Sequence, residues 1–138
     1  MSKSIAVLSL FALLAIASAH EFAGTHTVEL TAANYDEKTG DGKVYMIAYF
    51  APWCGHCKRL APSWTEMATK LADNKNVAVA YIDCTAHREI CSDAGVKGYP
   101  TIKVLHKNEE YKAYKGARDI DSLSSFLLDA AKDLTSEV

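Results

Sequence analysis

Residues 44–60 read VYMIAYFAPWCGHCKRL and carry the strongest structural and chemical signal in the chain. The first seven, Val44 to Phe50, form an unbroken apolar run, which is typical of a strand covered on both faces. The C-x-x-C pair that follows, Cys54 and Cys57, lies where this strand would give way to a helix. The first sulfur would then lie at a helix N-terminus, where unpaired N–H groups and the helix dipole stabilise a thiolate. The segment therefore predicts a reactive dithiol on an α/β scaffold.

A second apolar run, Val77 to Ile82, repeats the pattern of a buried strand. Between the two runs, apolar residues recur at intervals of three and four, which indicates one buried face of a long helix. These residues are Cys57, Leu60, Ala61, Trp64, Met67, Ala68 and Leu71. A strand, a helix and a strand in this order predict a parallel βαβ unit with both strands in the interior of the sheet.

Shorter elements are expected on either side of this unit. We expect strands at Thr27–Leu30, Thr101–Leu105 and Tyr111–Tyr114, and helices near Ala32–Tyr35, Ala86–Ala94 and Leu123–Leu134. The last two strands read as an exposed antiparallel hairpin in which Lys103 points outward. Either Asp119 or Asp121 can serve as the N-cap of the final helix.

Three motifs give the chain a resemblance to a known family. APWCGHCKRL at 51–60, Ala61-Pro62 behind it, and GYPT at 98–101 together resemble the catalytic domains of the protein disulfide isomerase family. The resemblance covers about Thr27 to Leu134 and implies the α/β thioredoxin fold, a central mixed sheet with helices on both faces. It implies an enzyme: a protein thiol–disulfide oxidoreductase or isomerase that forms, reduces or rearranges disulfides in secretory-pathway proteins without a cofactor.

The two cysteines are expected to have different roles in thiol–disulfide exchange. Cys54, at the exposed end of the helix, is the expected attacking thiolate, and Cys57, one turn inward, would resolve the mixed disulfide. His56, when protonated, would add a second positive neighbour to Cys54. By resemblance, Gly55 and His56 between the cysteines tune the redox potential toward that of the isomerases.

Four more residues complete the expected site. By resemblance, Tyr99 and Pro100 form a substrate-binding loop with a cis-proline, a trans turn proline being the alternative. Trp53 fits either the core or an exposed platform beside Cys54, and its place directly before that cysteine favours exposure. By resemblance, Arg118 can swing toward the site and lower the pKa of the resolving cysteine; the alternative is a solvated loop cation.

The other cysteine pair, Cys84 and Cys91, has a spacing that resembles a structural disulfide of some isomerase-family domains, between the end of a strand and the adjacent helix. The competing interpretation is a zinc ion shared with the C-x-x-C pair. Such a site would quench the dithiol and require both pairs to converge, so we expect no metal. Four other histidines share no ligand spacing and are expected at the surface: His20, His26, His87 and His106.

The chain departs from the family pattern in one place. Family catalytic domains usually bury a glutamate behind the dithiol and pair it with a lysine on the neighbouring strand, but the matching positions here hold Ala48 and Tyr81. Losing both together is physically consistent, since either charge alone would be buried without a partner. The internal acceptor for the proton of Cys57 is then missing. The Tyr81 hydroxyl or a buried water could replace it, but a slower resolving step is the simpler expectation.

The first 19 residues have the composition of a secretory signal peptide: Lys3, an apolar stretch from Ile5 to Ala17, and a small-residue site ending at Ala19. We therefore expect cleavage after Ala19, one thioredoxin-like domain over residues 20–138, and no membrane association after cleavage. The C-terminal residues, TSEV, are not a K-D-E-L-type signal. Both the endoplasmic reticulum lumen and secretion therefore remain open.

The charge pattern restricts the class of partner. A formal net charge of −2, with both signs interspersed, argues against nucleic acid. The expected partners are cysteine-containing client proteins, with a thiol oxidase or glutathione as redox partner. Two other functions fit the same residues: a general thiol reductase, and a redox-dependent, chaperone-like module that holds a client in a long-lived mixed disulfide.

Overall fold

The computed structural model describes residues 20 to 135, so the predicted signal peptide at 1–19 lies outside the described residues. In chain order the elements are β1 (Thr27–Leu30), α2 (Tyr35–Thr39), β2 (Val44–Phe50), α3 (Gly55–Lys70), β3 (Val77–Asp83), α4 (Arg88–Asp93), β4 (Thr101–His106), β5 (Glu109–Ala113) and α5 (Ile120–Thr135). Within residues 20–135 no helix has the length and apolar character needed to cross a membrane.

The five strands form one mixed sheet in the order β1-β3-β2-β4-β5. β1, β3 and β2 are parallel, because α3 carries the chain from β2 back to the start of β3. β4 is antiparallel to β2, and β5 is antiparallel to β4. This is the expected thioredoxin fold.

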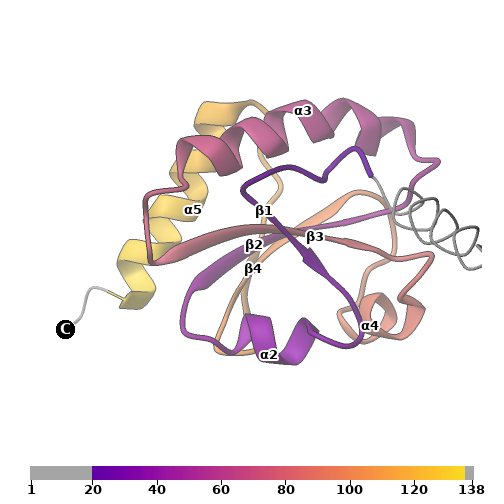
Figure 1. Ribbon diagram of the computed structural model, residues 1–138, viewed down its shortest axis with the longest axis horizontal. Helices are drawn as coiled ribbons and strands as arrows, with labels where there is room; N and C mark the ends of the chain where they lie inside the picture. The colour runs from indigo at the N-terminus through magenta and orange to yellow at the C-terminus, as the bar shows by residue number, and fades with distance from the viewer. Residues whose placement is uncertain (1–19, 136–138) are drawn as a thin grey trace, which may run out of the picture.

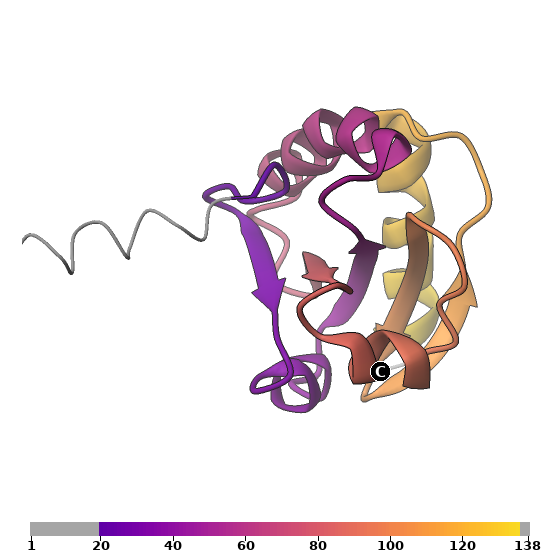
Figure 2. The same ribbon diagram turned by 90° about the vertical axis from the view of Figure 1, so that its right-hand side faces the viewer.

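Helices cover both faces of the sheet. α3 and α5 lie on one face, and the short helices α2 and α4 lie on the other (Figures 1 and 2). β2 lies at the centre of the sheet and is buried at all seven positions. The unbroken apolar sequence of β2 follows from this double cover, because a polar side chain on either face would have to find a partner in the interior.

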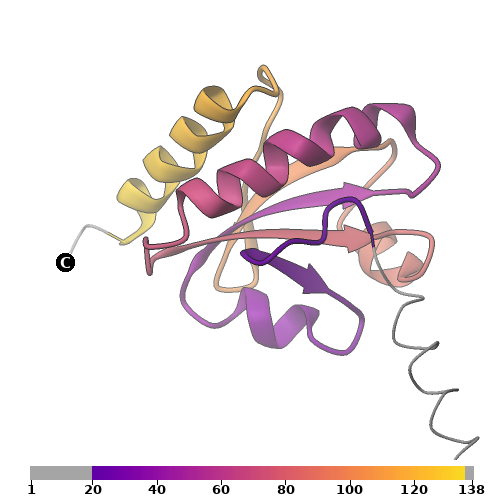
Figure 3. The ribbon, with the colours of Figure 1, turned by 45° about the horizontal axis from the view of Figure 1, so that its top comes forward.

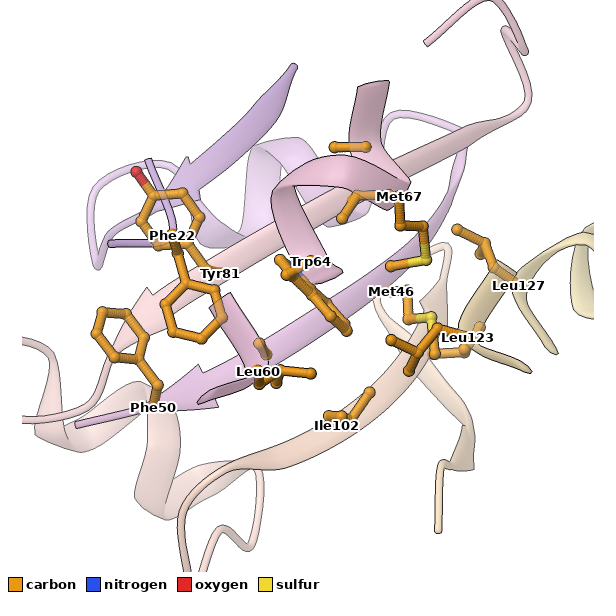
Figure 4. Packing of buried hydrophobic residues seen from close by; sticks show 14 of the residues in the cluster. Phe22, Met46, Phe50, Leu60, Trp64, Met67, Tyr81, Ile102, Leu123 and Leu127 are labelled. Atoms are coloured by element: carbon orange, nitrogen blue, oxygen red, sulfur yellow. The ribbon is translucent and has the colours of Figure 1, made fainter. Parts of the chain in front are cut away.

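Trp64 anchors α3 to the sheet. Its side chain is fully buried, and its indole Nε1 donates a hydrogen bond of 2.9 Å to the carbonyl oxygen of Ala80 on β3. Figure 4 shows Trp64 in the middle of the cluster, between Met46 on one side and the Phe22 ring on the other. The large apolar area of Trp64 is therefore buried without leaving its N–H group unpaired.

Two local predictions are wrong. α2 begins at Tyr35, where we expected it to end, because the residues before it form a turn closed by a 2.7 Å hydrogen bond from the Thr31 N–H to the Asn34 side chain. Lys103 is buried instead of pointing to solvent. Its Nζ donates to Glu110 at 2.7 Å and to the carbonyl oxygen of Ala94 beyond the end of α4, and this pairing makes the burial tolerable.

The structure decides between the two N-cap candidates of α5. A side-chain oxygen of Asp119 accepts a hydrogen bond of 3.0 Å from the Ser122 N–H, as an N-cap does. The hydrogen bonds with Ser122 also hold the pKa of Asp119 below its ordinary value. Asp121 instead lies in the first turn and pairs with Lys70 of α3 at 3.2 Å.

Cys84 and Cys91 are joined by a disulfide with a Cα–Cα distance of 5.7 Å. The bridge ties the residue after β3 to the middle of α4, and it occupies the two sulfurs that this pair would contribute to a shared zinc site. Because α4 has only six residues, its position depends on this bond and on a few apolar contacts.

Replacing both Cys84 and Cys91 by serine is expected to lower the free energy of unfolding by roughly 2–3 kcal/mol, the loop-closure contribution of so short a loop. The melting temperature should fall by about 10 °C. Thermal unfolding followed by circular dichroism, in the absence of reductant, measures this change. Equal melting temperatures for the two proteins would contradict a stabilising role for the bridge.

Candidate active site

The dithiol lies at the junction of β2 and α3. Cys54 is the N-cap residue of α3, with an extended backbone, and its Sγ accepts a hydrogen bond of 3.2 Å from the Cys57 N–H. The Cys54 thiol also donates to the carbonyl oxygen of Tyr99 at 3.4 Å. The sulfur therefore takes the place of the side-chain oxygen that usually caps a helix.

Cys57 is buried as expected, but Cys54 is more covered than the sequence suggested. Cys54 is 7% exposed and Cys57 is 1% exposed. The order agrees with the expected roles, but the expectation of an exposed Cys54 is wrong. The reason is tertiary: the loop that carries Tyr99 comes back against Cys54, which proximity along the sequence cannot reveal.

Cys57 is held in the protonated form. Burial is the largest cause, and together with a hydrogen bond to Cys54 it raises the pKa of Cys57 to about 12. A hydrogen bond with the backbone of Ala51 and the positive charge of Arg118 act in the opposite direction. The two thiols therefore differ in their surroundings: the Cys54 sulfur accepts a hydrogen bond from a backbone N–H, whereas the buried Cys57 must lose a proton before it can attack.

His56 lies on the exposed side of the first turn of α3, with a partner that sequence analysis overlooked. Its Nδ1 accepts a hydrogen bond from the guanidinium of Arg59 at 2.7 Å. The guanidinium of Arg59 therefore adds a positive charge beside His56 on the first turn of α3. The spacing of three residues on a helix was the available signal.

The surface around Cys54 contains an exposed aromatic side chain. Trp53 is 69% exposed, and its ring stands edge-on to the ring of Tyr99 at 5.8 Å between centroids. The peptide bond between Tyr99 and Pro100 is cis. Trp53 and Tyr99 also line one side of a groove of about 340 Å³ whose other side is formed by α4 and the residues after it. The structure thus places Trp53, Tyr99 and Pro100 around the dithiol.

Arg118 lies on the loop before α5, exposed to solvent. It lines the same pocket as Pro100, whereas Trp53 lines a different one. Its charge lowers the pKa of Cys57, although burial outweighs this effect. The direction agrees with the role implied by the resemblance.

The region behind the dithiol is apolar, as Ala48 and Tyr81 predict. The two residues are direct partners across β2 and β3, and Ala48 is fully buried. The Tyr81 ring packs with Phe22 and Phe50 at centroid distances of 6.0 Å (Figure 4). Burial raises the pKa of Tyr81 to about 12, so its hydroxyl stays protonated near neutral pH and is a poor acceptor for the proton of Cys57.

A cavity of about 230 Å³ lies beside Cys57, and sequence analysis did not foresee it. It is lined by His20, Glu21, Phe22, Phe50, Ala51, Pro52, Cys57 and Lys58. The segment that supplies the first three residues runs beneath α3 (Figures 1 and 3). His20 is therefore not a freely exposed residue: its side chain is 22% exposed. Residues 37 positions apart in the chain meet here, and no local sequence pattern indicates such a contact.

Comparisons with known proteins agree with this geometry. The family model described as Thioredoxin matches residues 26–129. Protein disulfide isomerase-like 2-2 of Oryza sativa subsp. japonica is 39% identical over 127 residues, which are 87% of this chain and 34% of that protein. The protein disulfide-isomerase-like protein EhSep2 of Emiliania huxleyi is 42% identical over 107 residues, which are 75% of this chain and 48% of that protein.

Solved structures give the same result for the fold. The first two thioredoxin domains of Eps1p from Naumovozyma dairenensis match with a TM-score of 0.72 and 26% identity, over 76% of this chain and 41% of that chain. This chain thus spans about a third to a half of the length of the relatives named above. The match of the family model over most of the chain, together with the topology of the sheet, shows that the chain belongs to the thioredoxin family.

Proposed function

We propose that the chain is a protein thiol–disulfide oxidoreductase of the protein disulfide isomerase type, acting on cysteine-containing client proteins. The observation that carries the proposal is the paired arrangement of two free thiols at the start of α3, with the Cys54 sulfur on the Cys57 N–H. Trp53 and the Tyr99–Pro100 loop supply a surface against which an extended client segment could lie.

The reaction follows from the two environments. The Cys54 thiolate attacks one sulfur of a client disulfide, the client S–S bond breaks, and one client thiolate leaves. Cys57 then loses its proton and attacks the Cys54 sulfur, which forms the Cys54–Cys57 disulfide and releases the second client thiolate. The client gains two electrons and the dithiol loses two. The reverse sequence oxidises a client, with a thiol oxidase or glutathione restoring the disulfide.

A second function is favoured by the raised pKa of Cys57. If the resolving step is slow enough, the mixed disulfide through Cys54 persists, and the chain acts as a redox-dependent module that holds clients. The apolar residues at the two positions behind the dithiol, Ala48 and Tyr81, favour this alternative. The rate of release from a mixed disulfide separates it from the catalytic function.

The location that fits this activity is the secretory pathway. We infer from the composition of residues 1–19 that they form a signal peptide cleaved after Ala19, which leaves a thioredoxin-like domain over 20–138 in the endoplasmic reticulum lumen or outside the cell. The disulfide between Cys84 and Cys91 is consistent with an oxidising compartment.

Replacing Cys54 by serine should reduce insulin reduction and the oxidative refolding of a reduced client to their uncatalysed rates, because the attacking sulfur is lost. Replacing Cys57 by serine should leave attack intact and trap clients as mixed disulfides, visible as adducts on a non-reducing gel. The adducts should disappear when both substitutions are combined. Substantial turnover in the Cys54→Ser variant would refute the assignment.

Restoring the missing charge pair should speed up the resolving step. With Ala48→Glu and Tyr81→Lys together, adjacent across β2 and β3, a proton acceptor and its counter-ion would lie behind Cys57. Ala48→Glu alone should lower the free energy of unfolding by roughly 3–5 kcal/mol, because its carboxylate is buried without a cation. Urea unfolding and stopped-flow measurement of the resolving step check the two effects. The matched control is Ala48→Gln with Tyr81→Met, which fills the space without charges and should give no acceleration.

A further inference from the structure

The cavity beside Cys57 offers a route by which the proton of its thiol can leave. The sheet residues behind the dithiol, Ala48 and Tyr81, offer no such route. The cavity has room for several waters, and Cys57 on α3 and His20 from the N-terminal segment both line it. Residues of this segment are well anchored: Phe22 is 1% exposed, and its carbonyl oxygen accepts a 2.9 Å hydrogen bond from the Thr27 hydroxyl. The carbonyl oxygen of His20 accepts a further bond of 3.0 Å from the Ala23 N–H.

The imidazole of His20 has a defined environment. Its ring stands edge-on to Phe50 at 5.8 Å and to Tyr81 at 6.3 Å, and its Nε2 lies 3.9 Å from a carboxylate oxygen of Glu29 on β1. A carboxylate at this distance stabilises an imidazolium once it has formed. His20 is therefore packed beside the cavity, and the Glu29 carboxylate is the partner for the positive charge that its imidazole gains with a proton.

We propose that His20 accepts, through water in this cavity, the proton that the Cys57 thiol must lose to resolve a mixed disulfide. The inference rests on the proposed function and names a residue that assists one step of it. The S–H bond of Cys57 breaks, its proton passes to the imidazole, and the sulfur attacks Cys54 while the client thiolate leaves. The imidazolium returns its proton to solvent or to the departing thiolate.

The other groups around the cavity are less suited to this role. The titratable and charged groups that face His20 are Glu29 on β1, Tyr81 on β3, Cys57 and Lys58 on α3, and Glu21 beside it in the chain. Cleavage after Ala19 would add the α-amino group of His20 itself, which is mostly an ammonium near neutral pH. An ammonium has no proton-accepting site, a carboxylate is a weaker base than imidazole, and the Tyr81 hydroxyl keeps its proton near neutral pH. Histidine is the side chain whose ordinary pKa lies between pH 5 and 8, where it can accept and release a proton in each cycle.

The test follows the two steps of the reaction separately. When the reduced protein is mixed with 5,5′-dithiobis(2-nitrobenzoate), attack by Cys54 releases a first equivalent of thionitrobenzoate, and attack by Cys57 releases a second. In the His20→Gln variant the second phase should be slower at pH 7 by roughly 10- to 100-fold. This factor lies at or below the smallest rate enhancement that general acid–base catalysis typically contributes. The first phase should be unchanged.

The pH profile separates proton transfer from a structural effect. In the native protein the second phase should show an inflection between pH 5 and 8, as an imidazole acceptor requires. In His20→Gln it should instead rise about tenfold per pH unit over this range, following the small thiolate fraction of Cys57. Added imidazole should restore part of the rate in His20→Ala, because the substitution enlarges an existing cavity. A loss of packing alone would give neither the altered profile nor the rescue.

His26→Gln is the matched control, because His26 belongs to the same N-terminal segment but lines a different pocket. Its second phase should match that of the native protein. Equal second phases in His20→Gln and the native protein would overturn the role of His20 and leave the proposed function standing. Absence of the first phase in the native protein would overturn the proposed function, and the role of His20 with it.

Discussion

The structure depends above all on the burial of β2 on both faces. Within residues 20–135 four helices cover the sheet, and β2, at its centre, has no exposed residue. This constraint makes the strand apolar, and it fixes the place at which chemistry can occur: the point where the buried strand ends and α3 begins. At this point Cys54 caps the helix with its sulfur and Cys57 lies beneath it. The reactive and the structural demands on the segment are therefore met by the same residues.

The same burial separates the properties of the two thiols. Cys54 has a backbone donor at its sulfur, whereas the interior around Cys57 disfavours its anion and raises its pKa to about 12. A charged pair behind Cys57 would help Cys57 to lose its proton. Either charge without the other, however, would be buried in the core without a partner. With Ala48 and Tyr81 the chain avoids that risk, and these two positions supply no charged acceptor for the proton of Cys57. His20 and Cys57 both line the cavity at the end of β2.

Sequence reasoning predicted the features that local patterns determine. The apolar runs gave β2 and β3, the periodicity gave the buried face of α3, and the C-x-x-C motif gave the position of the dithiol. It failed where a contact joins distant parts of the chain. Lys103 follows an alternating pattern, yet α4 and Glu110 cover it. The loop at Tyr99 covers Cys54, and His20 lines the same cavity as Cys57, through an arrangement of distant segments that neither pattern nor spacing encodes.

The two proposed functions, catalysis and client holding, therefore share one mechanism and differ in the rate of a single step. Both begin with attack by Cys54, and they differ only in how long the mixed disulfide lasts before Cys57 displaces the client. That lifetime is set by how readily Cys57 loses a proton, because its thiolate is the attacking species. Burial lengthens the lifetime, while Arg118 and any acceptor in the cavity shorten it. A small change around Cys57 would therefore move the chain from one function to the other without altering its fold.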